Sequence, residues 1–266
     1  MRSSIVFRAR RWLVLCSLLS LAGCATAPVA PTTPLRSPPG AALPGAVRTI
    51  VIDAGHGGHD PGTHHFGLKE KHLALDIAKR LRTHLQRRGL TVVMTRDSDR
   101  FIPLSGRPAI ANRLHADLFV SVHINANRNR RVSGIEVYYP RASVVSASAQ
   151  WPPAVSPAEV AIPSMTVKQV LWDLVLKRTR SGSRRLASSV CRSMRTGLQV
   201  HCRGVKPARF VVLREAWMPA ILVEVGYVSN QTEAQRLGRA DYREAAAQSI
   251  SEGIVSYIRD QGAEHI

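Results

Sequence analysis

The chain is poor in cysteine, aromatic residues and acidic residues. Its 266 residues include 4 Cys, 5% aromatics, and 18 Asp plus Glu against 37 Lys plus Arg. So few cysteines in a chain of this length exclude a disulfide-stapled miniprotein, and 18 Gly and 16 Pro exclude a collagen-like chain. The 45% of apolar residues is enough for one core, or at most two small ones, which excludes a wholly disordered protein.

Several common catalytic signatures are also absent. The sequence contains no Walker-type phosphate loop, no Gly-x-Ser-x-Gly nucleophile elbow and no HExxH helix. The glycine-rich stretch 55–62 does not fit a dinucleotide-binding loop, because Asp60 stands where the third glycine belongs. Serine hydrolysis and phosphate chemistry therefore lack their usual sequence support.

The net charge is strongly positive, at +19, which favours an anionic partner such as nucleic acid, anionic lipid or an acidic wall polymer. Arginines crowd the first eleven residues and precede an apolar run at 12–22, which is too short to span a bilayer as an ordinary helix. This pattern predicts an export signal. Export makes nucleic acid an unexpected partner and favours polymers of the cell envelope.

The apolar run ends in Leu21-Ala22-Gly23-Cys24, which resembles the lipobox of bacterial lipoproteins. The resemblance implies that residues 1–23 are a signal peptide, that Cys24 is acylated and anchors the protein to a membrane, and that Ala25 favours the outer membrane. The alternative is an ordinary secretory signal with an incidental cysteine. Residues 24–47 are rich in proline and are expected to form a semi-rigid tether on the periplasmic side.

Cys191 and Cys202 are the cysteines left for pairing, because Cys16 lies in the signal and Cys24 is the acylation candidate. A bridge in an oxidising compartment would close a short loop and add about 3 kcal/mol. Two unpaired, partly buried thiols are an equally open alternative.

From residue 48 onward, short apolar runs alternate with segments of helical period. The predicted strands are 49–53, 91–95, 117–124, 134–139, 210–213 and 220–225. Helices are expected before Gly89, at 104–115, 167–177 and 184–198, and after the capping boxes Asn230/Glu233 and Asp241/Glu244. The pattern predicts an α/β fold, a three-layer α/β/α sandwich on a six-stranded, mostly parallel sheet, with a proline-broken insertion at about 141–180.

Metal-capable side chains follow the predicted strands. His56 lies just past the first strand, Glu70 opens the first helix, and His123 closes the strand 117–124. The carboxyl ends of parallel strands share one edge of a sheet, so these residues are expected to converge. Two imidazoles and one carboxylate suit Zn²⁺ and leave one tetrahedral position open, as catalytic zinc requires.

Glu224 is the single acid in the apolar stretch 220–226. An unpaired carboxylate there would be costly to bury. The residues alone leave two interpretations equally open: an exposed or salt-bridged structural glutamate, or a general base at the metal site.

Six blocks of sequence resemble the zinc-dependent N-acetylmuramoyl-L-alanine amidases in order and spacing: Asp53–Gly58, Gly67–Glu70, Ser121–Ala126, Gly134–Tyr139, Arg203–Lys206 and Leu222–Asn230. The resemblance implies a catalytic domain at 48–262 that hydrolyses the amide bond between N-acetylmuramic acid and L-alanine in peptidoglycan, for wall remodelling or daughter-cell separation. It also implies that His56, Glu70 and His123 hold one Zn²⁺ and that Glu224 is the catalytic acid/base. The alternatives are a catalytically inactive wall-binding protein and a zinc peptidase or deacetylase.

Other residues are weaker candidates. Arg107 and Asn125 could contact substrate, although a salt bridge at a helix start and a turn cap are the favoured interpretations. Division amidases of this type often carry an inhibitory helix in the position of the insertion, and Glu159 is the acid there that could cap the metal until a protein activator moves it. The basic cluster at 177–185 is favoured as a solvated face over a contact with anionic wall or lipid. A monomer is expected.

Overall fold

The structure is a computed structural model that describes residues 47–141 and 165–263. Its strands are β1 (Thr49–Ala54), β2 (His64–His65), β3 (Leu68–Lys69), β4 (Thr91–Met94), β5 (Leu118–Asn125), β6 (Ile135–Pro140), β7 (Cys202–Ala208) and β8 (Ala220–Tyr227). Its helices are α1 (Glu70–Gln86), α2 (Gly106–Arg113), α3 (Met165–Leu198), α4 (Val211–Arg214), α5 (Gln231–Gly238) and α6 (Ala240–Ala263). No helix in these ranges is long and apolar enough to cross a membrane.

The main sheet has six strands in the order β4-β1-β5-β8-β6-β7. Strands β4, β1, β5 and β8 are parallel to one another, β6 is antiparallel to β8, and β7 is parallel to β6. The short strands β2 and β3 form a separate antiparallel hairpin. The prediction of a six-stranded, mostly parallel sheet is confirmed, and the reversed pair β6-β7 makes the sheet mixed.

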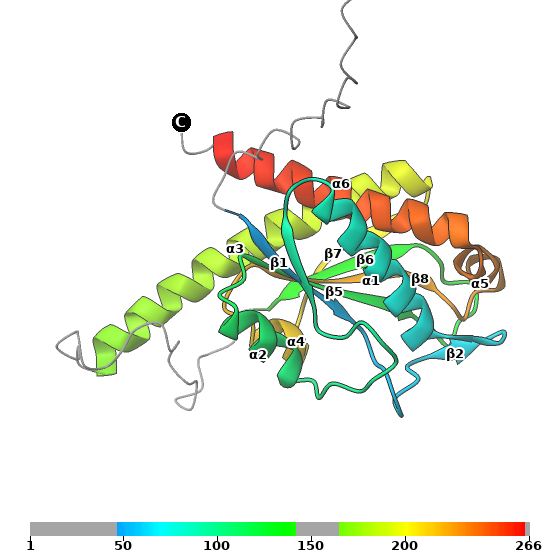
Figure 1. The fold of residues 1–266 in the computed structure, drawn as a ribbon, viewed down its shortest axis with the longest axis horizontal. Helices are drawn as coiled ribbons and strands as arrows, with labels where there is room; N and C mark the ends of the chain where they lie inside the picture. Colours follow the sequence, from blue (N-terminus) through cyan, green and yellow to red (C-terminus); the bar gives the residue numbers. More distant parts are fainter. Residues whose placement is uncertain (1–46, 142–164, 264–266) are drawn as a thin grey trace, which may run out of the picture. The chain divides into compact units, whose positions relative to one another are not determined.

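Helices cover both faces of this sheet (Figure 1). The larger core lies under α1, α3 and α6, where Ile77, Val190 and Ile254 are fully buried against the strands. The smaller core lies under α2 and α4, where Phe119 of β5 packs with Leu213. The predicted three-layer α/β/α arrangement is therefore confirmed.

The first long helix forms as its sequence pattern predicts. Leu73, Ile77, Leu81 and Leu85 recur every four residues and are all buried on one side of α1. Gly89 follows with a φ of 82°, a left-handed conformation that glycine adopts without strain. One apolar stripe thus fixes which face of α1 packs on the sheet.

The predicted strand at 210–213 is wrong. Phe210 precedes helix α4, which begins at Val211, and the sixth strand of the sheet is β7 instead. The apolar run at 210–213 is too short for its period to separate strand from helix. Strand β7 escaped detection because it lies at the edge of the sheet, is only half-buried, and contains Pro207, which is tolerated on edge strands.

The two predicted helices 167–177 and 184–198 are one continuous helix, α3. Gly182 lies between them and does not break the helix, because it serves close packing: a Cβ there would lie 3.0 Å from Pro219 and 3.1 Å from the Tyr257 hydroxyl. Helix α3 begins at Met165, so the C-terminal part of the predicted insertion at 141–180 lies within this helix. Glu159 lies outside the described residues, as does Cys24.

One of the two predicted capping boxes is present in part. Asn230 caps α5 by accepting the backbone N–H of Glu233 at 3.1 Å. The Glu233 carboxylate does not return to Asn230 but accepts the backbone N–H groups of Gly134 at 2.8 Å and Tyr227 at 2.7 Å. This buried glutamate therefore ties α5 to the loop before β6.

The second predicted capping box, at Asp241 and Glu244, is wrong. Helix α6 begins one residue earlier, at Ala240, and the Asp241 side chain pairs with Arg239. The Glu244 carboxylate binds Arg80 at 2.6 Å and His84 at 2.8 Å. These partners lie on α1, so long-range pairing has replaced the local cap.

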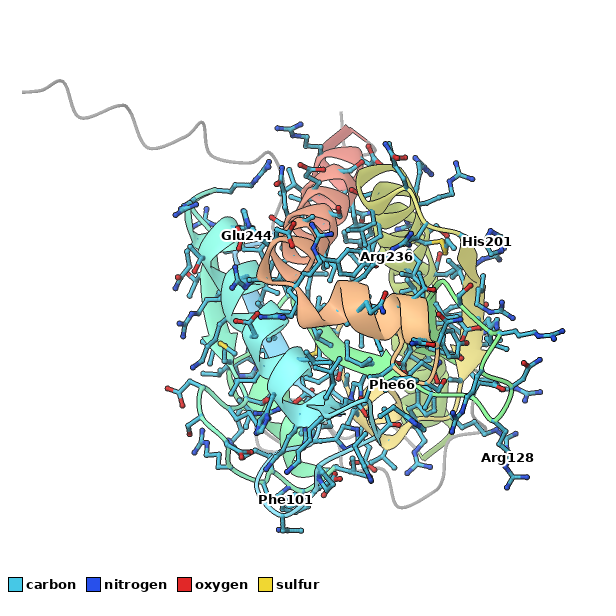
Figure 2. All side chains as sticks on the ribbon, turned by 90° about the vertical axis from the view of Figure 1, so that its right-hand side faces the viewer. Phe66, Phe101, Arg128, His201, Arg236 and Glu244 are labelled. Atoms are coloured by element: carbon cyan, nitrogen blue, oxygen red, sulfur yellow. A yellow bond between two sulfur atoms is a disulfide. The ribbon has the colours of Figure 1, made fainter. Side chains whose placement is uncertain are left out.

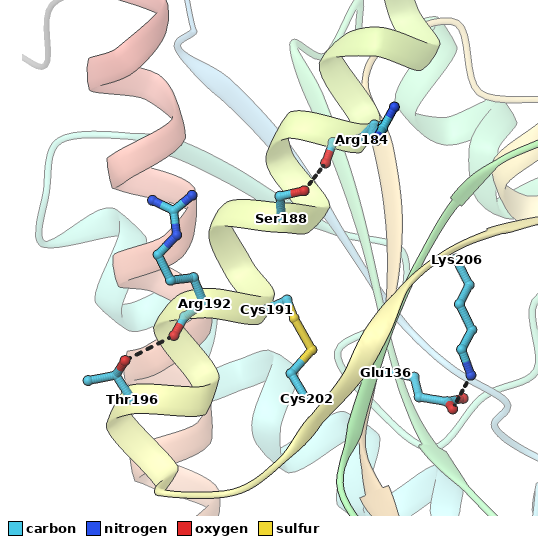
Figure 3. The surroundings of a disulfide bond; sticks show 8 residues. All are labelled: Glu136, Arg184, Ser188, Cys191, Arg192, Thr196, Cys202 and Lys206. Atoms are coloured by element: carbon cyan, nitrogen blue, oxygen red, sulfur yellow. Dashed lines mark hydrogen bonds and ion pairs between the residues drawn. A yellow bond between two sulfur atoms is a disulfide. The ribbon is translucent and has the colours of Figure 1, made fainter.

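The structure joins Cys191 of α3 to Cys202 of β7 in a disulfide (Figure 3). Of the two alternatives left open by the sequence, the structure has the bridge. It links the long helix to the edge strand of the sheet.

Candidate metal centre

Three side chains with metal-binding atoms meet where β1 and β5 end. His56 follows β1, Glu70 is the first residue of α1, and His123 lies near the end of β5. One ligand atom of each lies within 4.8 Å of the others, and the two imidazole rings are 5.0 Å apart between centroids. The predicted convergence of these residues is present. Figure 2 looks onto this end of the molecule.

The Glu70 carboxylate lies between the two imidazoles. Its Oε2 is 3.1 Å from Nε2 of His56, and its Oε1 is 2.9 Å from Nδ1 of His123. The same oxygens accept the backbone N–H groups of Thr63 at 2.9 Å and Ile124 at 3.0 Å. Burial alone would raise the pKa of Glu70, but the hydrogen bonds with both histidines lower it by a larger amount. The pKa therefore lies below its ordinary value, and the carboxyl group is ionised.

Asp60 orients the His56 ring. Its Oδ2 lies 2.7 Å from Nδ1 of His56, while its Oδ1 accepts the N–H of Gly62 at 3.0 Å. When neutral His56 keeps its proton on Nδ1, its Nε2 is free to bind an ion, which is the arrangement that metal-binding histidines require. Sequence reasoning passed over Asp60, although its position four residues after His56 in a glycine-rich loop was visible.

Two glycines make room for the rings. A Cβ on Gly55 would lie 2.4 Å from the His123 ring, and a Cβ on Gly62 would lie 2.5 Å from the Glu70 carboxylate. Gly62 also has a φ of 65°, which side chains rarely adopt. The backbone is thus fitted closely around the three candidate ligands.

Two buried arginines hold the loop that carries His56. Arg96 donates to the carbonyls of Ala54 at 2.8 Å and Gly55 at 2.6 Å. Arg107 donates to the carbonyls of Ala54 at 2.8 Å and His56 at 2.9 Å. Backbone carbonyls left inside the protein need such partners. The two guanidinium groups therefore fix the backbone on both sides of Gly55.

The substrate contact considered for Arg107 is not supported. Its side chain is 2% exposed and pairs with the fully buried Asp53 at 3.1 Å. Asp53 also accepts hydrogen bonds from Thr95 and Ser121, both at 2.7 Å. The salt bridge at the start of α2 is present, and it positions His56 instead of meeting substrate.

Glu224 lies beside the cluster on β8. Its register partner on β5 is His123, and its partner on β6 is Glu136. Oε2 of Glu224 is buried and has no hydrogen-bond partner among the described residues. Burial and the charges of Glu70 and Glu136 raise its pKa well above the ordinary value. A buried carboxyl without a partner is rare in a structural role. This observation favours the interpretation of Glu224 as a general base over that of a structural glutamate.

The residues present fit a divalent metal. The donor set of two imidazoles and one ionised carboxylate suits Zn²⁺, Asp60 supplies the outer partner that orients a ligand, and Glu224 places an uncommitted carboxyl next to the set. Among the described residues this is the one group of three or more candidate ligands close enough to share an ion.

Comparison with protein families matches residues 50–256 to N-acetylmuramoyl-L-alanine amidase. The chain belongs to this amidase family. It is 35% identical over 232 residues to N-acetylmuramoyl-L-alanine amidase AmiA of Escherichia coli strain K12. This alignment covers 84% of this chain and 80% of AmiA. The enzyme class expected from the sequence is confirmed.

Solved amidase structures share the fold. N-acetylmuramoyl-L-alanine amidase AmiC2 of Nostoc punctiforme superposes with a TM-score of 0.63 at 33% identity, covering 80% of this chain and 97% of that structure. The amidase of Clostridium difficile 630 gives a TM-score of 0.63 at 32% identity, covering 79% of this chain and 96% of the other. The α/β fold of the family is therefore present in this chain.

A second charged cluster of the amidase surrounds Glu136. This residue is 3% exposed, and its carboxylate binds Lys206 at 2.5 Å, Arg203 at 3.3 Å and the Tyr138 hydroxyl at 2.5 Å. Burial alone would raise the pKa of Glu136, but Lys206 and Tyr138 lower it by a larger amount, so the pKa lies below its ordinary value. Glu136 therefore carries a negative charge next to Glu224 on the neighbouring strand. Sequence reasoning gave it no role, although it lies within the block 134–139.

Asn125 stands at the end of β5, two residues after His123. Its Oδ1 accepts the backbone N–H of Ala126 at 2.8 Å, and its Nδ2 lies 3.4 Å from Glu136 Oε2. The first contact is the turn cap that the sequence favoured. The side chain is half-buried at the rim of the site.

Proposed function

We propose that this amidase uses Zn²⁺ to hydrolyse the amide bond between the lactyl carbonyl of N-acetylmuramic acid and the amino group of L-alanine in peptidoglycan. The observation that carries the proposal is the set of His56, Glu70 and His123 within 4.8 Å, beside the buried and unpartnered Oε2 of Glu224.

His56, Glu70 and His123 are the residues that hold the ion. Zn²⁺ bound by them supplies a Lewis acid that polarises the scissile carbonyl and makes water more acidic. Asp60 keeps the proton of His56 on Nδ1, so that Nε2 is free to bind. The hydrogen bonds from Thr63 and Ile124 hold the Glu70 carboxylate in one orientation.

Glu224 moves the proton. Its carboxylate accepts one proton from the attacking water, whose oxygen bonds to the lactyl carbonyl carbon. The carboxyl then gives this proton to the alanine nitrogen as the C–N bond breaks, which leaves a free stem-peptide amine and a lactyl carboxylic acid that loses its remaining proton to water. Such positioned proton transfer contributes about 10²- to 10⁴-fold in rate. Asn125, at the rim, is a candidate to contact the substrate.

Digestion of purified sacculi tests the reaction. We expect release of free stem peptides, loss of release with a chelator, and recovery when Zn²⁺ is added back, followed by mass spectrometry of the products. Free acetate would identify a deacetylase, and cleaved peptide bonds would identify a peptidase. Wall binding with no product of either kind would identify a catalytically inactive wall-binding protein.

Location and control are further parts of the proposal. The arginine-rich start and the apolar run at 12–22 support export, and Cys24 supports a lipid anchor on the periplasmic side, with the outer membrane favoured by Ala25. Radiolabelled fatty acid should be incorporated into the chain and not into a Cys24→Ser variant.

The segment before α3 is proposed to shield the site until a protein activator displaces it, with Glu159 as the capping acid. Residues 142–164 lie outside the described structure, so this part rests on sequence alone. Deletion of 143–163 should raise basal hydrolysis of sacculi. Unchanged hydrolysis would remove the idea. The proposed monomer can be checked by light scattering of the purified chain.

A further inference from the structure

Helix α3 carries a strongly basic surface that the amidase reaction does not use. The stretch 177–198 contains seven Lys and Arg and no Asp or Glu. Lys177, Arg180, Arg184 and Arg192 are exposed, and none of them pairs with a carboxylate among the described residues. Arg180 instead lies over the Tyr139 ring, 5.9 Å from its centroid. We name these four residues the α3 basic surface.

The surface is hollowed where α3 meets α6. A cavity of about 420 Å³ lies between the helices, and Arg184, Arg185 and Arg192 line it from α3. Asp260 of α6 is the one acid in its lining. A second hollow of about 230 Å³ adjoins it and is lined by Lys177, Arg180 and Arg184. Guanidinium groups around a concave surface suit phosphate and other oxyanions.

The first half of this surface lies at the edge of the sheet where the parallel strands begin. Ser183 of α3 accepts the backbone N–H of Ala220, the first residue of β8, at 2.9 Å. Thr49, the first residue of β1, binds Asp117 next to the start of β5 at 2.8 Å. The candidate metal ligands follow the opposite ends of these strands. Figure 1 shows the beginning of α3 on the side of the molecule away from the β2 hairpin.

The chain enters the folded domain at the same edge, because β1 begins there. Residues 24–46 can reach at most roughly 80 Å from Cys24 to this entry point. A lipid anchor at Cys24 would therefore attach the domain through this edge and not through the catalytic edge. A tether of this kind also gives a weak surface contact a high effective concentration.

We propose that the part of the α3 basic surface at the edge where the parallel strands begin, formed by Lys177, Arg180 and Arg184, docks on the anionic headgroups of the bilayer to which Cys24 is anchored, so that the catalytic edge faces away from the membrane, towards the wall. This orientation rests on the proposed lipid anchor. The contact is electrostatic and is screened by salt, because its charges are exposed. A membrane-bound protein commonly combines one lipid chain with such a basic patch.

Vesicle binding of two matched variants tests the proposal. The first, Lys177→Gln/Arg180→Gln/Arg184→Gln, removes three charges from α3. The control, Arg128→Gln/Arg130→Gln/Arg131→Gln, removes three exposed charges from the loop between β5 and β6, at the catalytic edge. Arg128 is labelled there in Figure 2. All chains carry the same residues before the folded domain, so differences between them report on the folded domain.

The measured quantity is the ratio of binding to vesicles containing phosphatidylglycerol over binding to pure phosphatidylcholine vesicles. Each Lys or Arg near an anionic surface contributes roughly fivefold, so the α3 variant should lose on the order of 100-fold in this ratio. The control should lose much less. An equal loss in both variants would mean that overall charge acts without orientation, and this would overturn the proposal.

Two further readouts separate this proposal from others. If the α3 variant keeps its vesicle ratio but binds less to lipid-free sacculi, the partner is the wall polymer and the membrane proposal fails. Hydrolysis of soluble muropeptides should be unchanged in the α3 variant. Failure of the amidase function would abolish that hydrolysis in every chain and leave the vesicle ratios intact.

Discussion

The parallel strands of the sheet end at the catalytic edge, beside the candidate metal ligands, and begin at the opposite edge, which we name the starting edge. The two edges use charge in opposite ways. At the catalytic edge, Glu70, Asp53 and Arg107 are buried, and each has partners at hydrogen-bond distance. At the starting edge, Arg180 and Arg184 are exposed and have no carboxylate partner among the described residues. Buried charges must be paired individually because solvent does not screen them, whereas exposed charges act together and each contributes little.

Glu224 is the exception that connects this difference to function. It lies at the catalytic edge. Among the described residues, it is the carboxylate that has a buried oxygen without a hydrogen-bond partner. An uncommitted acid in a site where every neighbour is committed is available for proton transfer. The comparison therefore predicts large effects for single changes at the catalytic edge and small effects for single changes at the other.

The largest effect is expected for Glu224→Gln. The amide keeps the size of the side chain but cannot accept a proton, so hydrolysis of muropeptides should fall by about 10²- to 10⁴-fold. Zinc content, measured by metal analysis of the purified protein, should stay the same, because Glu224 is not one of the three candidate ligands. Glu252→Gln, on α6, is the matched control. Retained turnover in Glu224→Gln would refute the assignment.

Arg107→Ala comes next and acts on stability. The change leaves Asp53 buried without its ion pair and removes the donor to the His56 carbonyl and one of the two arginine donors to the Ala54 carbonyl. We expect a loss of about 3–5 kcal/mol in the free energy of unfolding, measured by urea denaturation. The same measurement on Arg184→Ala at the starting edge should change by less than about 0.5 kcal/mol. Similar losses in both would remove the contrast between the edges.

Asp60→Asn should weaken the metal site without destroying the fold. The amide can no longer hold the proton on Nδ1 of His56 as a carboxylate does, so Zn²⁺ affinity should fall by about 10- to 100-fold. Competition with a coloured chelator measures this. Asp97→Asn, exposed in the neighbouring loop, should leave the affinity unchanged. An unchanged affinity in Asp60→Asn would show that the ring is oriented by packing alone.

The contrast between the edges also explains what the sequence could reveal. His56 and His123 were predictable because strand ends of a parallel sheet share an edge, and Glu70 because it opens the first helix. The role of Glu224 could not be decided from the residues alone, since burial without a partner is a property of the folded protein. The buried role of Arg107 was hidden for a similar reason: its partners Asp53 and Ala54 are more than fifty residues away in the chain.

The fold was predictable where a long apolar period exists and not where a short segment depends on its neighbours. The period of α1 gave both its extent and its buried face. Strand β7 has no such signal, because an edge strand that is half-buried can carry Lys206 and Pro207. Its hydrogen bonds to β6 define it, and they join residues far apart in sequence.

The smallest expected effect concerns an ion-pair cluster between helices α1 and α6. Asp76 of α1 binds Arg80 at 2.9 Å and Arg243 of α6 at 2.5 Å. Burial alone would raise the pKa of Asp76, but the two arginines lower it by a larger amount, so the pKa lies below the ordinary 3.8. A lowered carboxyl pKa means that the ion pairs stabilise the fold above the unfolded pKa and that this stability is lost as pH falls through the folded pKa.

Asp76→Asn should therefore lower the free energy of unfolding by about 0.5–1 kcal/mol at neutral pH, the usual range for a pair that solvent still reaches. The difference from the wild-type chain should shrink once the pH falls below about 4, because the wild-type carboxylate is then protonated as well. Urea denaturation at a series of pH values measures this, with Asp97→Asn as the control. A difference that persists undiminished in acid would show that Asp76 acts through packing and not through its charge.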